Sequence, residues 1–266
     1  TQALTMDRFV QGHRLVPPAF HDEVKTSVLT LDCWDARSEA AAGRFIWEHR
    51  GSSRFAAGSQ GVEFALVRHW QDTGQLPPVP PAAGIGHAER MISVSGSVSP
   101  TTADQIAWSR QNGFACIPFD ARAACGDAAA LALEENRVVQ SGLDALSQGR
   151  DPLIHTAEGP DDPAVPALLS AVEAAGADLA QTSQRAGEAL GRVLRRLLAE
   201  TNAPRAVVSG GDTSGYATRQ LGIFALSALA PTIPGASIFK AHAEGPMDGL
   251  ELALKGGQMG SPDYFG

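Results

Sequence analysis

The chain contains few cysteines, few aromatic residues and no long apolar stretch. Only three of its 266 residues are cysteines, and no two of them have C-x-x-C spacing. Neither a disulfide framework nor a zinc site is therefore indicated. The apolar runs are far shorter than the roughly 20 residues that a membrane-spanning helix needs, and residues 1–15 show no apolar core of a signal peptide. We expect a cytoplasmic protein with reduced thiols and no membrane partner.

Basic residues are also in deficit. Lys and Arg number 21 against 29 Asp and Glu, which gives a net charge of −8. Nucleic acids and anionic membranes bind basic faces, so we expect no nucleic-acid partner. One basic stretch contains Arg192, Arg195 and Arg196, but these alternate with apolar residues at helical spacing. Such a stretch is typical of a solvated helix face.

Several common catalytic and nucleotide-binding motifs are missing. The chain contains neither G-x-x-x-x-G-K-[ST] nor G-x-G-x-x-G, which excludes a Walker-type phosphate loop and a standard dinucleotide fingerprint. It also lacks the G-x-S-x-G elbow of α/β-hydrolases and the H-E-x-x-H zinc motif. A nucleotide site in this chain must be built in another way.

Apolar runs and helical stretches alternate through residues 91–266. This alternation predicts an α/β fold with a mostly parallel sheet flanked by helices. Long helices are expected over 100–113 and 127–149, and a helical stretch over 164–201 that breaks near Gly176. A short helix is expected over 215–222. The expected strands, about six in number, cover 91–97, 114–120, 152–159, 205–211, 236–243 and 249–257.

The first 72 residues predict a smaller α/β unit. We expect a strand over 27–33, a helix over 35–51 that Asp35 caps, a strand over 54–61 and a helix over 62–70. Two strands cannot form a sheet that is covered on both faces, so residues 1–72 are interpreted as part of a domain. Residues 73–90 are rich in proline and glycine and predict an extended linker.

Three glycine-rich turns follow strands of the C-terminal region. Parallel strands would bring such turns to one edge of the sheet, where ligands bind in open α/β folds. Glycines allow successive backbone N–H groups to approach an anion, and the next helix N-terminus adds positive potential. We therefore predict a nucleotide-phosphate site, although each turn alone also fits a plain turn. Its residues are Ser95, Gly96, Ser97, Gly210, Gly211, Asp212, Thr213, Gly256 and Gly257.

Asp212 is the one carboxylate inside these turns. It would repel phosphate unless it binds Mg²⁺ or accepts the proton of an attacking hydroxyl, so we predict a metal-binding or catalytic role. A fourth turn, Gly58, Ser59, Gln60 and Gly61, lies before the linker. Its geometry suits a carboxylate or sugar hydroxyls, and equally a helix cap without further function.

Four motifs in this order resemble one known family. They are AGSQGVEFALVRHW, VSGSVSPTTADQIAW, VVSGGDTSGYATRQLGI and LELALKGGQMGSPDYFG. They are similar to the motifs of the four-carbon acid sugar kinases. The resemblance implies two α/β domains, of which the first binds an acid such as threonate or erythronate and the second binds ATP with Mg²⁺. It also implies transfer of the γ-phosphoryl group to the terminal hydroxyl of the acid, with 58–61 as the substrate-side loop.

One motif of that family has no counterpart here. Its first domain opens with a strand and turn of the form D-D-x-x-G, which holds the acceptor and is expected to supply the catalytic base. We therefore expect a chain that lacks the front of its substrate domain and does not turn over alone. A homodimer is compatible with this interpretation. The alternatives are a non-catalytic nucleotide- or metabolite-binding module, and another transferase or hydrolase that uses the same turns.

Overall fold

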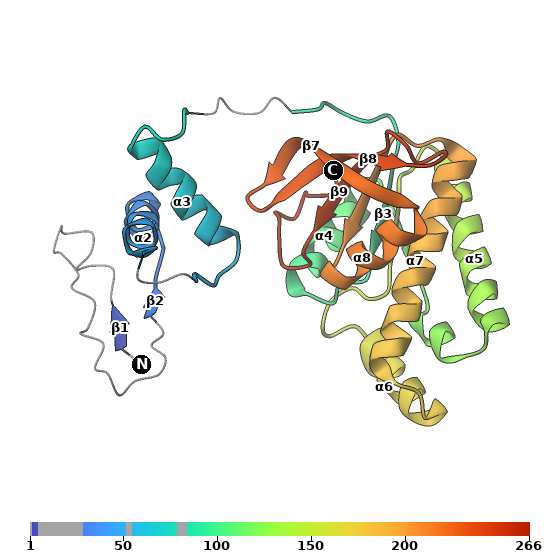
Figure 1. The fold of residues 1–266 in the computed structure, drawn as a ribbon. Coiled ribbons are helices and arrows are strands. Elements are labelled where there is room, and N and C mark those ends of the chain that lie inside the picture. Colours follow the sequence, from blue (N-terminus) through green and yellow to red (C-terminus); the bar gives the residue numbers. More distant parts are fainter. Residues whose placement is uncertain (1, 5–28, 52–54, 79–83) are drawn as a thin grey trace. The chain divides into compact units, whose positions relative to one another are not determined.

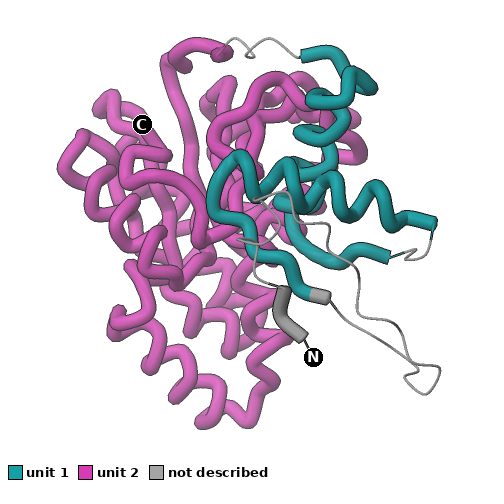
Figure 2. The backbone as a smooth tube through the Cα atoms, turned by 90° about the vertical axis from the view of Figure 1, so that its left-hand side faces the viewer, with its two compact units in different colours: residues 1–81 teal, residues 82–266 magenta. Residues whose placement is uncertain are grey.

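The computed structural model describes residues 2–4, 29–51, 55–78 and 84–266. It divides the chain into two compact units, residues 1–81 and 82–266 (Figure 2). In the described residues no helix is long and apolar enough to cross a membrane.

Unit 1 consists of two helices and a small parallel sheet. Strand β1 (Gln2–Leu4) pairs with β2 (Leu29–Leu31). Helix α2 (Ala36–His49) begins at a capping box in which Asp35 and Ser38 bond each other's backbone N–H. It packs on α3 (Gln60–Asp72), and the two helices approach so closely that a Cβ at Gly43 would overlap the Ala65 carbonyl. The two helices of the prediction are therefore confirmed.

The strand predicted over 54–61 is wrong. Residues 55–58 have no regular structure, and α3 already begins at Gln60. Residues 55–61 are all exposed, so this short apolar run gains neither a strand partner nor a covered face. Most of the predicted loop or edge strand over 1–26 lies outside the described residues, as does part of the linker.

Unit 2 contains a sheet of seven strands within residues 84–266. Their order is β4-β5-β3-β6-β9-β8-β7. The first five are parallel, whereas β8 and β7 run antiparallel to their neighbours. The mostly parallel α/β fold is thus confirmed. The strands are β3 (Met91–Ser95), β4 (Ala115–Pro118), β5 (Pro152–His155), β6 (Arg205–Ser209), β7 (Ile223–Ile233), β8 (Ala236–Ala243) and β9 (Glu251–Lys255).

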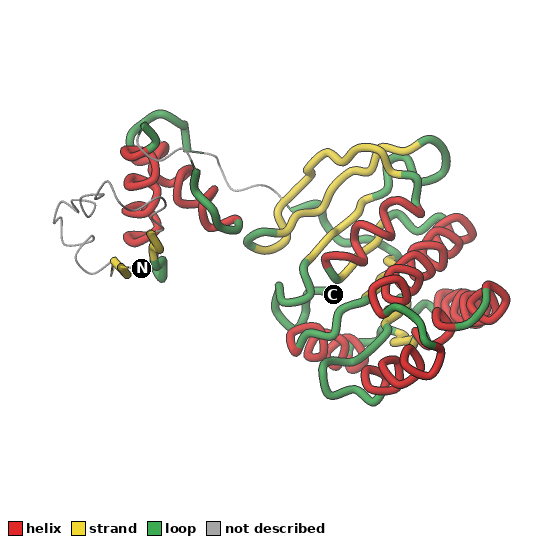
Figure 3. The backbone as a smooth tube through the Cα atoms, turned by 60° about the horizontal axis from the view of Figure 1, so that its bottom comes forward, coloured by secondary structure: helices red, strands yellow, loops and turns green. Residues whose placement is uncertain are grey.

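Helices cover both faces of this sheet (Figures 1 and 3). Helices α5 (Ala128–Ser147), α7 (Leu179–Thr201) and α8 (Gly211–Gln220) pack on one face and bury the larger core with Val94, Val208 and Leu252. On the other face α4 (Pro100–Gln111) and the C-terminal segment bury Ile106 and Phe265 against Leu153, Val207 and Ala253. The short elements η1 (Ala121–Cys125) and α6 (Ala164–Ala175) complete the unit.

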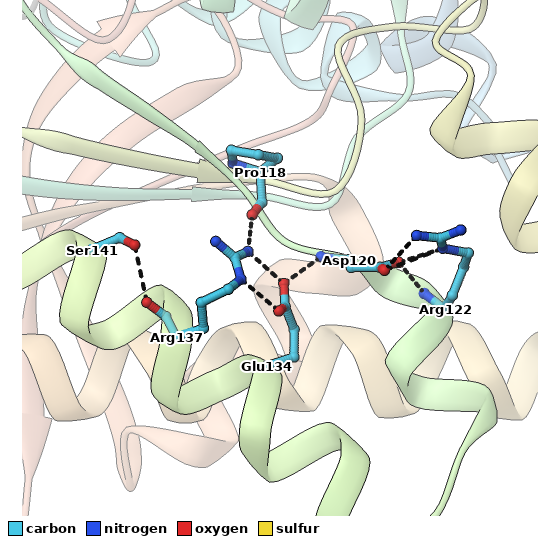
Figure 4. A network of polar contacts seen from close by, with 6 residues as sticks. All are labelled: Pro118, Asp120, Arg122, Glu134, Arg137 and Ser141. Atoms are coloured by element: carbon cyan, nitrogen blue, oxygen red, sulfur yellow. Dashed lines mark hydrogen bonds and ion pairs between the residues drawn. The ribbon is translucent and has the colours of Figure 1, made fainter.

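Local chemistry fixes the helix ends. The side chains of Asp127 and Asp178 accept the N–H three residues on, which starts α5 and α7. Gly176 ends α6 in the left-handed conformation with φ of 58°, and this is the predicted break. A polar network joins α5 to the end of β4: Arg137 pairs with Glu134 and donates to the Pro118 carbonyl (Figure 4).

Strand β7 was not predicted. Its sequence IFALSALAPTI has no alternation, and residues 224–229 are all exposed because β7 forms the edge of the sheet. It forms through antiparallel pairing with β8, which is joined to it by a tight turn at 234–235.

Candidate nucleotide-binding site

The three glycine turns of unit 2 meet at one edge of the sheet. Strands β3, β6 and β9 are neighbours, and their register pairs Ser95 with Ser209 and Ser209 with Lys255. The three strands therefore end at the same level, and each leads directly into its turn. The expectation that parallel strands gather these turns is confirmed.

Hydrogen bonds join the three turns at their bases. The Gly96 N–H donates to the Ser209 carbonyl at 3.1 Å, and the Gly210 N–H donates to the Lys255 carbonyl at 3.0 Å. These two donors are already satisfied and are not available to an anion. A ligand at this edge must use the N–H groups that follow.

The glycines let the turns pack against one another. A Cβ at Gly96 would overlap the Thr213 hydroxyl oxygen, and a Cβ at Gly257 would overlap that of Ser97. Gly210 has φ of 117° and ψ of 132°, a conformation that other residues rarely adopt. The glycines are thus required for the assembly of the edge itself.

Helix α8 begins four residues earlier than the predicted 215, at Gly211. Gly210 links β6 to the helix without an intervening loop. The N–H groups of Gly211, Asp212 and Thr213 therefore lie in the first helical turn, where no acceptor four residues earlier exists within the helix. These three donors and the positive end of the helix dipole could hold an anion.

The side chains of this helical turn differ in exposure. Thr213 is buried against the glycine turn that follows β3, while Asp212 is exposed. Mg²⁺ is commonly held by one or two carboxylates together with phosphate oxygens and water, so a single exposed Asp212 fits such an ion. In the part of the chain that the structure describes, no three His, Cys, Asp or Glu side chains gather into a metal cluster.

Hydroxyl groups on α4 fix the third turn. Ser99 caps α4, and both Ser99 Oγ and Thr102 Oγ1 donate to the Gly257 carbonyl, the latter at 2.8 Å. The Thr102 hydroxyl also lies 3.0 Å from Ser97 Oγ. Helix α4 therefore links the turn after β3 to the turn after β9. Ser99 and Thr102 were not among the predicted site residues, although both lie in the quoted motif.

Lys255 was also missed. This lysine ends β9 and is only 3% exposed. Its ammonium contacts the Gly256 and Met259 carbonyls at 3.4 Å and the rings of Tyr264 and Phe265. Burial lowers the pKa of Lys255 to about 8. The signal in the sequence is a lysine at the end of the apolar run LELALK, directly before two glycines.

A fourth strand end adds a histidine to this edge. His155 ends β5, pairs in register with Ser95, and is 2% exposed. Burial lowers the pKa of His155, and its Nε2 lies 3.6 Å from Glu158, which Arg110 holds through two hydrogen bonds. Asp162 accepts the Glu158 N–H at 2.6 Å. The acidic loop after β5 therefore has its partners within the fold.

The predicted substrate-side turn lies in unit 1. Gly58 and Ser59 precede α3, while Gln60 and Gly61 lie in its first turn, and all four are exposed. Ser59 makes no side-chain cap hydrogen bond. The turn thus presents an open helix N-terminus, which suits an anion or a hydroxyl.

Comparisons with known proteins agree with this geometry. The family described as "Nucleotide-binding C-terminal domain" matches residues 92–265. The chain is 42% identical to the 3-oxo-isoapionate kinase of Paraburkholderia graminis, over 90% of this chain and 51% of that protein. It is 31% identical to the 3-oxo-tetronate kinase of Cupriavidus necator, over 78% of this chain and 44% of that protein.

A solved structure shares the fold. It is a Salmonella typhimurium LT2 protein provisionally described as a tRNA synthase, with a TM-score of 0.61 and 26% identity over 89% of this chain and 51% of that one. The chain spans about half the length of the curated relatives it matches. With a family match over most of its length and a relative at 42% identity, the chain belongs to the four-carbon acid sugar kinase family, and residues 92–265 are its nucleotide-binding C-terminal domain.

Proposed function

We propose that this chain is the ATP-binding part of a kinase that phosphorylates the terminal hydroxyl of a sugar acid. The observation that carries the proposal is the meeting of three glycine turns at the ends of β3, β6 and β9. In this proposal residues 91–266 bind the nucleotide, residues 73–90 are the linker, and residues 1–72 are the C-terminal part of the acid-binding domain. The turn 58–61 would then bind the acid.

The nucleotide phosphates would bind at the first turn of α8. The N–H groups of Gly211, Asp212 and Thr213 donate to them there, with Ser95, Gly96 and Ser97 on one side and Gly256 and Gly257 on the other. Mg²⁺ bound at Asp212 would neutralise developing charge on the transferred phosphoryl group. The alternative role of Asp212, if it does not hold the ion, is to accept the proton of the attacking hydroxyl.

The names of the relatives favour an acceptor with a 3-oxo group. Both kinases above are named for 3-oxo sugar acids, of which the tetronate has the four carbons that the sequence motifs imply. Threonate and erythronate belong to the same chemical class without the oxo group. The tRNA role ascribed to the Salmonella protein is not carried over, since this chain has a net charge of −8 and a nucleic-acid site needs a basic face.

Calorimetry tests the nucleotide site. We expect the chain to bind ADP with Mg²⁺ at micromolar to submillimolar concentration, because several N–H donors and a helix N-terminus face the phosphates. AMP, which lacks the second phosphate, serves as the matched ligand and should bind more weakly. No binding of ADP at millimolar concentration by a folded chain would refute the proposal.

Acceptor chemistry is tested in a protein that joins this chain to a complete acid-binding domain. ATP is mixed with 3-oxo-tetronate, 3-oxo-isoapionate, threonate or erythronate, and the phosphate ester is detected by mass spectrometry. An ester from one of them supports the kinase. Nucleotide binding without any ester would favour the second candidate, a nucleotide-binding module without catalysis. This candidate is considered because the chain matches only about half the length of the kinases. Light scattering tests whether the chain forms the homodimer with which the sequence is compatible.

A further inference from the structure

Lys255 is an unusual residue for the end of a central strand. It is 3% exposed, and no carboxylate of the described residues forms an ion pair with it. Among the residues that the structure describes, its three donors meet only two carbonyls, both at 3.4 Å, and the two aromatic rings of the C-terminal segment. A buried ammonium without a counter-ion is unfavourable and is typical of functional sites.

The contacts of the Gly256 and Gly257 carbonyls determine where the next N–H groups of the third turn point: the first contacts Lys255 and accepts the Met259 N–H, and the second accepts from Ser99 and Thr102. The structure has no cis peptide bond in the described chain, and a trans peptide directs its carbonyl and its N–H in opposite directions. Because the Gly256 carbonyl points toward the Lys255 ammonium, the Gly257 N–H of the same peptide points away from it. With the Gly257 carbonyl on Ser99 and Thr102, the Gln258 N–H is turned away from α4.

These two successive donors remain available. In the described part of the chain neither the Gly257 N–H nor the Gln258 N–H has a protein acceptor. Gly257 is half-buried and Gln258 is exposed, so both lie near the surface of the edge. They belong to the turn beside the one that starts α8, because β9 pairs with β6.

The geometry points to Lys255 as a positioning residue of the nucleotide site: it holds the Gly256 carbonyl so that the Gly257 N–H faces the phosphates, beside the Gln258 N–H that Ser99 and Thr102 orient through the Gly257 carbonyl. The polyphosphate bound on the far side of this peptide supplies the negative potential that the ammonium lacks within the protein. This inference rests on the proposed nucleotide site and adds a residue to it. A purely structural lysine would need no anion, and its charge would not be coupled to the ligand.

The coupling has a definite sign. The free protein holds Lys255 with a pKa of about 8 because of burial. A nearby phosphate favours the charged ammonium and raises this pKa, so binding takes up protons around pH 8. Affinity for ADP is then greatest below pH 8, and it falls by about tenfold as the pH rises to 9.

The other titratable groups around this edge would not produce the same pH dependence of ADP binding. Ser209 on β6 and Ser237 on β8 flank the end of β9 and do not titrate. Burial raises the pKa of Tyr264 above 10 and lowers that of His155 below 6.5, so neither changes charge between pH 7 and 9. Asp212 on α8 and Asp263 in the C-terminal segment stay in place in every variant compared.

The test measures binding of ADP and of adenosine by calorimetry at pH 7 and pH 9. Lys255→Met keeps an unbranched side chain against Tyr264 and Phe265 but removes the charge and the donors. We expect it to weaken ADP at least tenfold at pH 7, to leave adenosine within twofold, and to abolish the fall between pH 7 and 9. Lys255→Arg should retain ADP affinity at both pH values.

Lys240→Met is the matched control, because Lys240 is an exposed lysine of the same sheet. It should leave both ligands unchanged. If Lys255→Met does not fold, the unaltered chain gives the result: ADP binding at pH 8, where a phosphate with a second pKa of about 6 is already ionised, should take up protons in a comparison of two buffers.

The outcomes separate this inference from the proposed function. ADP binding that Lys255→Met leaves within twofold, with the same pH dependence, overturns the role of Lys255 while the nucleotide site stands. ADP binding by the unaltered chain without proton uptake at pH 8 overturns it as well. A folded chain that binds no ADP at any pH contradicts the proposed function and this inference together.

Discussion

Two helices of the chain begin in a glycine-rich turn with an acidic residue in the first helical turn, and their surroundings differ. Helix α8 follows β6 directly, with Gly210 as its N-cap and Asp212 in its first turn. Helix α3 follows an exposed stretch without regular structure, with Ser59 as its N-cap and Glu63 in its first turn. Their sequences suggest equivalent anion sites. In the structure only α8 begins where neighbouring strands end.

The difference shows what a glycine turn needs in order to become a site. At α8 the turn after β3 packs against the helix start and the turn after β9 packs against the turn after β3, so that Gly96 and Gly257 have no room for a side chain. At α3 a Cβ on Gly61 would meet nothing within 4 Å. The first set of glycines is therefore required by the fold of the sheet edge, whereas at Gly61 only a ligand could require glycine.

The largest expected effect separates these two kinds of glycine. Gly210→Ala forces a side chain into a conformation with φ of 117° and places its Cβ 3.0 Å from the Thr213 hydroxyl. We expect a loss of about 3 kcal/mol of unfolding free energy, from strain of 1–3 kcal/mol together with crowding. Gly61→Ala, the matched change in α3, should gain up to about 1 kcal/mol. Urea unfolding measures both, and equal effects would contradict the comparison.

A smaller effect separates the two acidic residues. Asp212→Asn should weaken binding of Mg²⁺-ADP by about tenfold, or about 1.4 kcal/mol, if the carboxylate holds the ion. Without Mg²⁺ the same variant should bind ADP at least as tightly as the unaltered chain, because a negative charge beside the phosphates is removed. Glu63→Gln at the start of α3 is the control and should change neither affinity. Weaker binding of metal-free ADP by Asp212→Asn would contradict the metal role.

Much of unit 2 could be predicted because its strands and helices carry strong local signals. The helix predicted over 127–149 is observed as Ala128–Ser147, and β3, β5 and β6 are short, mostly apolar strands that end in polar residues. Once parallel pairing is assumed, the meeting of the turns follows from where these strands end. The sequence pattern alone was therefore enough to predict that the turns meet at one edge of the sheet.

The remaining features depend on tertiary contacts. Residues 211–214 contain glycine, Asp, Thr and Ser, which are weak helix formers, so the early start of α8 comes from packing and not from propensity. The Gly210 N–H donates to the Lys255 carbonyl because β6 and β9 pair in this register. The same register buries Lys255, whereas the sequence shows only a lysine at the end of an apolar run and not how deeply it is buried.

The smallest expected effect concerns the polar strand end at His155. Burial lowers its folded pKa below the ordinary 6.5, while the unfolded chain titrates normally. As the pH falls, the histidine of the unfolded state takes up its proton before that of the folded state. The contribution of His155 to the unfolding free energy is therefore fully present above pH 6.5 and is lost as the pH falls below 6.5. Glu158, held by Arg110, has a lowered pKa, so its stabilisation is present above its unfolded pKa and is lost only at more acidic pH.

His155→Gln should therefore flatten the decline in unfolding free energy between pH 7 and 5, and Glu158→Gln should not. Chemical denaturation at a series of pH values separates the two windows, because the carboxylate affects stability only below the range in which the histidine does. A decline that persists unchanged in His155→Gln would show that the buried ring does not titrate with folding. The difference between the starts of α8 and α3 would then depend on the glycines and on Asp212 alone. The end of β5 would only pack beside the sheet edge that β3, β6 and β9 form.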